Sequence, residues 1–200
     1  SAIIGIGAGY QFNNWFRADV TAEYRGSAAY RKGMTYTAFC PNPYCLDTYT
    51  ANVNSSVFML NGYVDLGTWS GVTPYVGAGV GMANHRMKGL TDVGAGLGVA
   101  ADASKTNFAW ALMAGLGYNV TPNLKIDLGY RYLDMGPVSS NPIVCEAITS
   151  CFFEVQSYRH TAHDLRLGVR YMLGDASAGP MLAPTAPIFG GRPGPLVRKY

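Results

Sequence analysis

Apolar and polar side chains alternate with a period of two along most of this chain. Between Trp110 and Val120 every second residue is apolar or aromatic, and mostly small residues fill the positions between them. Successive side chains of a β-strand point to opposite faces, so this pattern predicts strands with one apolar face and one polar or small face. The pattern recurs in seven segments, at about residues 4–12, 16–25, 57–66, 73–82, 110–120, 124–132 and 165–173.

The connections between these predicted strands alternate in length. Each strand has about ten residues, which a tilted strand needs to cross a bilayer. Short connections with turn residues fall at 13–14, 68–71 and 121–123, whereas long loops are predicted at 27–54, 83–106 and 135–159. Short turns at one end and long loops at the other are typical of a transmembrane barrel. The sequence therefore predicts an all-β, antiparallel, up-and-down β-barrel of the eight-strand type over residues 1–173, with seven strands in this chain.

The composition excludes several other classes of protein. Only 14% of the 200 residues are charged and 48% are hydrophobic, which excludes a disordered chain. No apolar run reaches the roughly 18 residues of a helical membrane span. The formal net charge of +3 is dispersed along the chain, so no basic patch for nucleic acid is predicted.

The predicted inner faces of the strands carry cations and acids in nearly equal number. Side chains just fill the interior of an eight-stranded barrel, and an unpaired charge is costly to bury. We therefore expect these charges to pair and to block the interior. A gated pore and a catalytic carboxylate pair are the alternatives. The set is Arg17, Asp19, Glu23, Arg25, Asp65, Lys125, Asp127, Arg131, Asp164, Arg166 and Arg170, with Arg17, Asp19, Lys125 and Asp127 expected near the short-turn end and Arg131 and Asp164 higher.

Four segments carry a family resemblance, namely GAGYQFNNWFRADVTAEYRG, NGYVDLGTWSGVTPYVGAGVG, GLGYNVTPNLKIDLGYRYLDMG and HDLRLGVRYML. With them the chain resembles the small outer-membrane β-barrel proteins of alphaproteobacteria, the opacity-like surface antigens, related in architecture to the OmpA membrane domain. The resemblance implies an eight-stranded barrel, a surface-antigen or envelope-structural role, and no common catalytic activity. The last segment also resembles the assembly signal read by the barrel-insertion machinery, with Arg166, Gly168, Tyr171 and Leu173 at the matching positions.

Pattern and resemblance together predict a non-enzymatic protein of the Gram-negative outer membrane with its long loops outside the cell. The expected partners are outer-membrane lipid and lipopolysaccharide, and the barrel-assembly machinery during insertion. No cofactor, metal or nucleic acid is expected. The alternatives are a narrow porin-like channel and a lipid-A-modifying enzyme, for which Ser157 and His163 share a strand face. His160 and His163 fall on opposite faces, which is poor metal-binding geometry.

Four cysteines lie in two of the predicted long loops and allow three pairings. Because the members of each pair are close in sequence, we expect two local disulfides, Cys40–Cys45 and Cys145–Cys151. A zinc site is the alternative, but neither spacing is Cys-x-x-Cys.

Residues 174–200 differ in kind, because the segment is rich in proline and glycine and ends in Arg198-Lys199-Tyr200. It reads as a flexible periplasmic tail or as a peptide that docks a periplasmic or neighbouring envelope protein.

Seven strands do not close a bacterial barrel, because these barrels have an even number of strands. Topology places Ser1 on the loop side, so we expect an N-terminal strand to be missing from the chain. The strand at 2–12 should then be an edge that faces the strand at 164–173 across a gap. The tail should be a poor substitute, since prolines remove hydrogen-bond donors from a ladder; they stand at Pro184, Pro187, Pro193 and Pro195.

Overall fold

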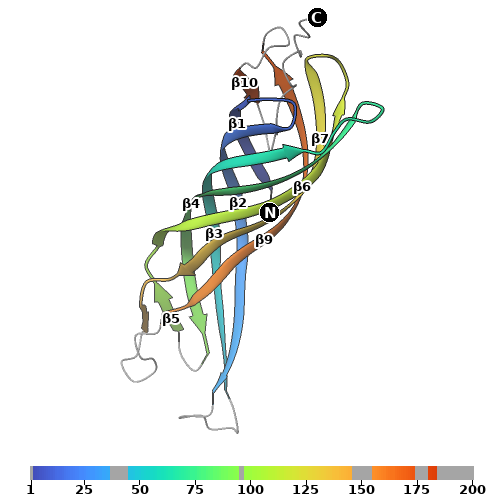
Figure 1. Ribbon diagram of the computed structural model, residues 1–200. Helices are drawn as coiled ribbons and strands as arrows, with labels where there is room; N and C mark the ends of the chain where they lie inside the picture. Colours follow the sequence, from blue (N-terminus) through green and yellow to red (C-terminus); the bar gives the residue numbers. More distant parts are fainter. Residues whose placement is uncertain (1, 37–44, 95–96, 146–154, 174–179, 184–200) are drawn as a thin grey trace, which may run out of the picture.

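The computed structural model describes residues 2–36, 45–94, 97–145, 155–173 and 180–183. These residues form one antiparallel sheet that winds around a common axis (Figure 1). None of the described residues belongs to a helix long and apolar enough to cross a membrane. The strands are β1(Ile3–Gln11), β2(Phe16–Tyr36), β3(Cys45–Asp65), β4(Val72–Val93), β5(Leu97–Ala100), β6(Ala103–Asn119), β7(Leu124–Ser139), β8(Ile143–Cys145), β9(Ser157–Met172) and β10(Pro180–Ala183).

Seven long strands follow one another around the sheet in chain order. Each of β1, β2, β3, β4, β6 and β7 pairs with the next long strand. The short strand β5 pairs with β4 at the loop end of the sheet, and β8 pairs with β5. The predicted all-β, antiparallel, up-and-down architecture and all seven predicted strands are confirmed.

The prediction of long loops is wrong for much of residues 27–54, 83–106 and 135–159. In the first range β2 continues to Tyr36 and β3 already begins at Cys45. Most of the second range and part of the third also belong to strands, so the sheet extends well past the predicted membrane-spanning part. We call this part of the sheet the loop-side extension. Figure 1 shows it as the long, narrow end opposite the short turns.

The loop-side extension was missed because the polarity of the two strand faces inverts there. In the spanning part the apolar residues face outward, whereas in the extension Tyr49, Val53 and Met87 are buried inside. Outward positions such as Asn52 and Arg86 are polar and exposed. The period of two continues through the extension. Because its apolar residues lie on the inner face, its strands lack the apolar outward face that predicts a membrane-spanning strand.

The ladder around the sheet is not continuous between β9 and β1. These two strands run in the same direction and are not paired with each other; the short β10 lies between them. It pairs with β1 over Gly7–Tyr10 and with β9 only at Tyr171 and Met172. We call the interval between β1 and β9 the seam. The expectation that the first strand faces the last across a gap is therefore confirmed.

Residues 180–183 nevertheless add to the sheet, so within the described residues the tail substitutes for the missing strand over a short length, with four residues paired to β1 and two to β9. A proline is tolerated at the first position of a strand, where Pro180 stands. The rest of the tail lies outside the described residues. Cys40, Cys151 and the side chains of Cys45 and Cys145 also lie outside the described part, and so do the predicted disulfides.

The seam leads to a prediction about cross-linking. Cysteines replacing Ile4 and Leu167 should form no disulfide. Near the short turns β10 lies between β1 and β9, and if the two strands keep that separation of two strand widths, their Cα atoms are about 9–10 Å apart, beyond the roughly 7 Å limit for bridged Cα atoms. Cysteines at Leu128 and Leu167, which are directly paired, should cross-link readily. Non-reducing electrophoresis of both variants, with the native cysteines replaced by serine, distinguishes the two cases. Efficient Ile4–Leu167 cross-linking would contradict the open seam.

Candidate functional site

The interior of the barrel holds every charged residue that the sequence places on an inner face. All of them are buried, and they come from β2, β3, β7 and β9. β2 carries Arg17, Asp19, Glu23 and Arg25, β3 carries Asp65, β7 carries Lys125, Asp127 and Arg131, and β9 carries Asp164, Arg166 and Arg170. Because β2 lies across the barrel from β7, their inward side chains meet at the axis.

The upper group of these charges is centred on Glu23. Arg131 donates to both carboxylate oxygens of Glu23, from Nη1 at 2.8 Å and Nη2 at 2.7 Å. Arg166 donates to Oε1 of the same carboxylate. Arg131 also donates to Oδ2 of Asp164 at 2.7 Å. Asp164 in turn accepts both Nη groups of Arg25, at 2.6 and 2.9 Å. The five side chains form one chain of alternating charge, which we call the lumen network.

A second group of charges lies nearer the short turns. Arg17 donates through Nε to Oδ1 of Asp65 at 2.9 Å, and its guanidinium lies between the rings of Tyr63 and Tyr75, 4.3 and 4.6 Å from their centroids. Such cation–π contacts are favourable when desolvated. Farther around the barrel, Arg170 is bonded to Asp127, Asn61 donates to Asp19, and Lys125 is buried.

The opposite side of the interior is apolar, which sequence reasoning missed. A cluster of buried side chains from β3, β4, β6 and β7 fills it, including Met59, Tyr63, Tyr75, Met113 and Met135. The sequence feature that indicates large side chains on this side of the interior is the glycine-rich part of β4. Its glycines lie opposite Tyr63, Asn61 and Met59, and a Cβ at Gly77 would lie 2.6 Å from the Tyr63 ring. These glycines leave room for the long side chains of β3 that lie opposite them.

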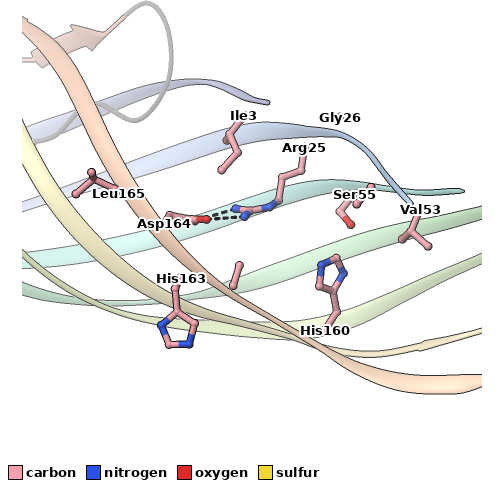
Figure 2. A pocket seen from close by; sticks show the side chains of 11 residues that line it. Ile3, Arg25, Gly26, Val53, Ser55, His160, His163, Asp164 and Leu165 are labelled. Atoms are coloured by element: carbon pink, nitrogen blue, oxygen red, sulfur yellow. Dashed lines mark hydrogen bonds and ion pairs between the residues drawn. The ribbon is translucent and has the colours of Figure 1, made fainter. Parts of the chain in front are cut away.

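A cavity of about 410 Å³ opens at the loop end of the seam. Figure 2 shows Arg25 and Asp164 joined by their hydrogen bonds in this cavity, with Ser55 and His160 beside them. His160 lies beyond Leu165, the last outward apolar residue of β9, and burial lowers its pKa to about 4. It is therefore a neutral side chain at pH 7.

The residues considered for catalysis are not brought together. Ser157 bonds to Ser139 at 3.1 Å, and His163 bonds to the Tyr130 hydroxyl at 2.5 Å. Next to the cavity, Ser55 Oγ lies 2.7 Å from His85 Nδ1, but the other ring nitrogen of His85 bonds to a backbone carbonyl and not to an acid. Among the described residues, no group of three or more His, Cys, Asp or Glu side chains is placed to hold a metal ion.

The loop-side extension has an apolar core of its own. Tyr49, Ala51, Val53, Met87, Leu90, Val138 and Ile143 form it, and Tyr30, Ala100, Ala103 and Tyr158 pack against it. This core stiffens the extension without help from a bilayer, because its apolar side chains are buried between strands of the same sheet. Residues of the assembly-signal pattern, Arg166 to Leu173, lie at the other end, on the last part of β9.

Comparison with known proteins gives consistent matches. The family described as "Outer membrane protein beta-barrel domain" matches residues 2–172. The outer membrane protein PagN of Salmonella typhimurium is 31% identical over 172 residues, covering 84% of this chain and 71% of PagN. A Rickettsia typhi protein named "Putative adhesin" is 27% identical and covers 84% of this chain and 73% of that protein.

Other relatives are longer than the present chain. An uncharacterized protein of Brucella suis is 36% identical over 149 residues, which are 66% of this chain and 51% of that protein. The chain thus spans about half the length of the Brucella relatives. Among solved structures, Neisserial surface protein A covers 84% of this chain and 95% of its own, with 18% identity and a TM-score of 0.40.

Proposed function

Since the chain belongs to the outer membrane protein β-barrel family, we propose that it anchors a rigid, partner-binding surface in the outer membrane and neither conducts solutes nor catalyses a reaction. The observation that carries this proposal is the contrast between the two parts of the sheet. The spanning part has an interior filled by ion pairs and apolar side chains. The loop-side extension continues beyond it with a core of its own.

The surface role has support in the relatives and in the extension. Two matched proteins are named as an outer membrane protein and as an adhesin. In the extension, exposed apolar side chains face outward on neighbouring strands, such as Val93, Leu97, Val99 and Val144. Exposed apolar patches on a rigid sheet are typical of protein-binding surfaces. In this proposal the extension stands outside the cell and acts in adhesion.

Apart from the four residues of β10, the proposal puts the tail, residues 174–200, on the periplasmic side, where it docks an envelope protein. The segment follows β9, which ends at the short turns, and its proline- and glycine-rich composition with a basic end suits an extended docking peptide. Lipid contact and insertion by the barrel-assembly machinery belong to the same proposal.

Surface labelling tests the orientation. An epitope inserted after Asp102, an exposed residue between β5 and β6, should be labelled by antibody on intact cells. The same epitope inserted after Ser70, in the short turn between β3 and β4, should be labelled only after the outer membrane is permeabilised. The reverse pattern would overturn the proposed surface role.

Planar-bilayer recording tests the blocked interior. The purified barrel should show no steady unitary conductance, because ion-paired side chains and the apolar cluster fill the interior. A general porin in the same bilayer is the positive control. Regular conductance steps from this protein would favour the porin-like alternative.

A further inference from the structure

The exposed cations of the described residues all lie at one end of the barrel. At the short-turn end, the cations Arg17, Lys125 and Arg170 are buried, and aromatic side chains such as Trp15 and Trp69 are exposed instead. At the loop end, the exposed cations are Arg31, Arg86, Lys88, Lys105 and Arg159. The two ends therefore meet surroundings of different charge.

Three of these cations form one outward-facing patch across three neighbouring strands. In the register of the sheet, Arg31 of β2 lies opposite Thr50 of β3. Lys88 and Arg86 of β4 lie opposite the next two outward residues of β3, Asn52 and Asn54. The neutral residues of β3 thus run down the middle of the patch, with cations on both sides. We call Arg31, Arg86 and Lys88 the basic patch.

The basic patch lacks acidic partners. Among the described residues, its three cations form no ion pair within 4.0 Å, in contrast to Arg25 and Arg131 of the lumen network. Asp102 is the acid beside the patch, and its Oδ1 accepts a hydrogen bond from the Gly89 amide at 3.2 Å. One acid leaves a net positive surface, which favours an external anion.

The lower edge of the patch, at Arg86, lies near a membrane headgroup layer. Met82 is the last exposed apolar residue on the outward face of β4 before Val93 at the far end of the strand, and Asn84, bonded to Ser104 and Thr106, follows it. Arg86 stands four residues beyond Met82. A rise of about 3.4 Å per residue and a strand tilt of about 40° put its Cα about 10 Å above the apolar edge. The headgroup layer is about 5–8 Å thick, so a long arginine side chain reaches down into it.

We propose that the basic patch binds the phosphate groups of lipopolysaccharide, on its lipid A part. This inference rests on the proposed function, which puts the loop end at the outer leaflet. A phosphate attached to acyl chains fits better than a free phosphate, because the patch continues directly into the apolar outer face. Arg86 can hold phosphate oxygens in a fork, and Lys88 adds a point charge. Arg31 stands farther from the apolar edge and adds to the positive field around them.

Lipid A binding to the purified full chain in detergent tests the inference. Native mass spectrometry would count bound diphosphoryl lipid A on the wild-type protein and on the double variant Arg86→Gln, Lys88→Gln. The double variant should bind at least tenfold more weakly. Its matched control is Lys32→Gln with Lys105→Gln, which removes two charges at the same end from positions on the inward parity of the sheet. The control should bind like wild type.

Two further measurements distinguish the phosphate of lipid A from free inorganic phosphate as the ligand. Dephosphorylated lipid A should bind both proteins equally weakly, and millimolar inorganic phosphate should not displace diphosphoryl lipid A. Equal binding by wild type and the double variant would overturn the inference, and so would equal loss in the control. If labelling puts the loop end outside while lipid A binding is insensitive to the patch, the proposed function stands and only this inference fails.

Discussion

Replacing Arg131 with methionine is expected to lower the free energy of unfolding by about 3 kcal/mol, the lower end of the range for breaking a buried ion pair. Arg131 holds Glu23 and Asp164 together, and all three are buried. Its removal leaves less positive charge beside two desolvated carboxylates. The loss is not larger because Glu23 keeps Arg166 and Asp164 keeps Arg25.

Urea titration of the protein refolded in lipid vesicles would measure this loss. The control is Arg159→Gln, which removes a cation from the ion pair with Asp134 at the loop end. The Arg159 side chain is 68% exposed, and the buried Asp134 keeps its hydrogen bond from the Gly136 amide, so the loss should stay below that of Arg131, at about 1–2 kcal/mol. Similar losses in the two variants would show that the lumen network does not stabilise the barrel.

Leu128→Arg is expected to lower the free energy of unfolding by about 2–4 kcal/mol, the cost of a cation on the lipid face near the bilayer midplane. Leu128 lies in the middle of the outward face of β7, and its paired neighbours Leu116 and Leu167 are exposed as well. An arginine there has no acid within reach on either neighbouring strand, so it must bend toward a headgroup layer.

The same vesicle titration of Thr106→Arg provides the comparison. Thr106 is an exposed outward residue of β6 in the polar row with Asn84, above the apolar belt. A cation there should change the stability by less than about 1 kcal/mol. If both substitutions cost little, the outward apolar face does not contact lipid.

The sequence by itself determined the strands of the spanning part and the direction of their side chains. Alternation is a local property, since successive Cβ atoms of a strand point to opposite faces whatever the rest of the chain does. Leu128 could therefore be assigned to the outer face and Arg131 to the interior without any knowledge of their neighbours. The short turns followed from local turn chemistry in the same way.

Only the tertiary structure decided which charges meet. Arg25 and Asp164 are 139 residues apart, and Glu23 and Arg131 are 108 apart, so their contact depends on the barrel curving β2 toward β7 and β9. Direct register is an incomplete guide. Arg131 bonds to Asp164, which lies opposite it, but Lys125 lies opposite Arg170, and Arg170 bonds to Asp127 instead. Long side chains choose partners across the lumen where there is space for them: a Cβ at Gly117 of β6 would lie 3.0 Å from Asp127 Oδ1 and 3.1 Å from Arg170 Nη2.

The loop-side extension and the seam were likewise decided in three dimensions. The alternation continues past the membrane edge. A period of two shows that a strand has two faces, but it does not show where the bilayer ends and the apolar face changes from the outer to the inner side. Pairing of β10 with β1 depends on a gap of suitable width between two distant strands. Backbone hydrogen bonds can be made by almost any residue, so edges and partners depend on the closure of the whole sheet and not on the identity of the side chains.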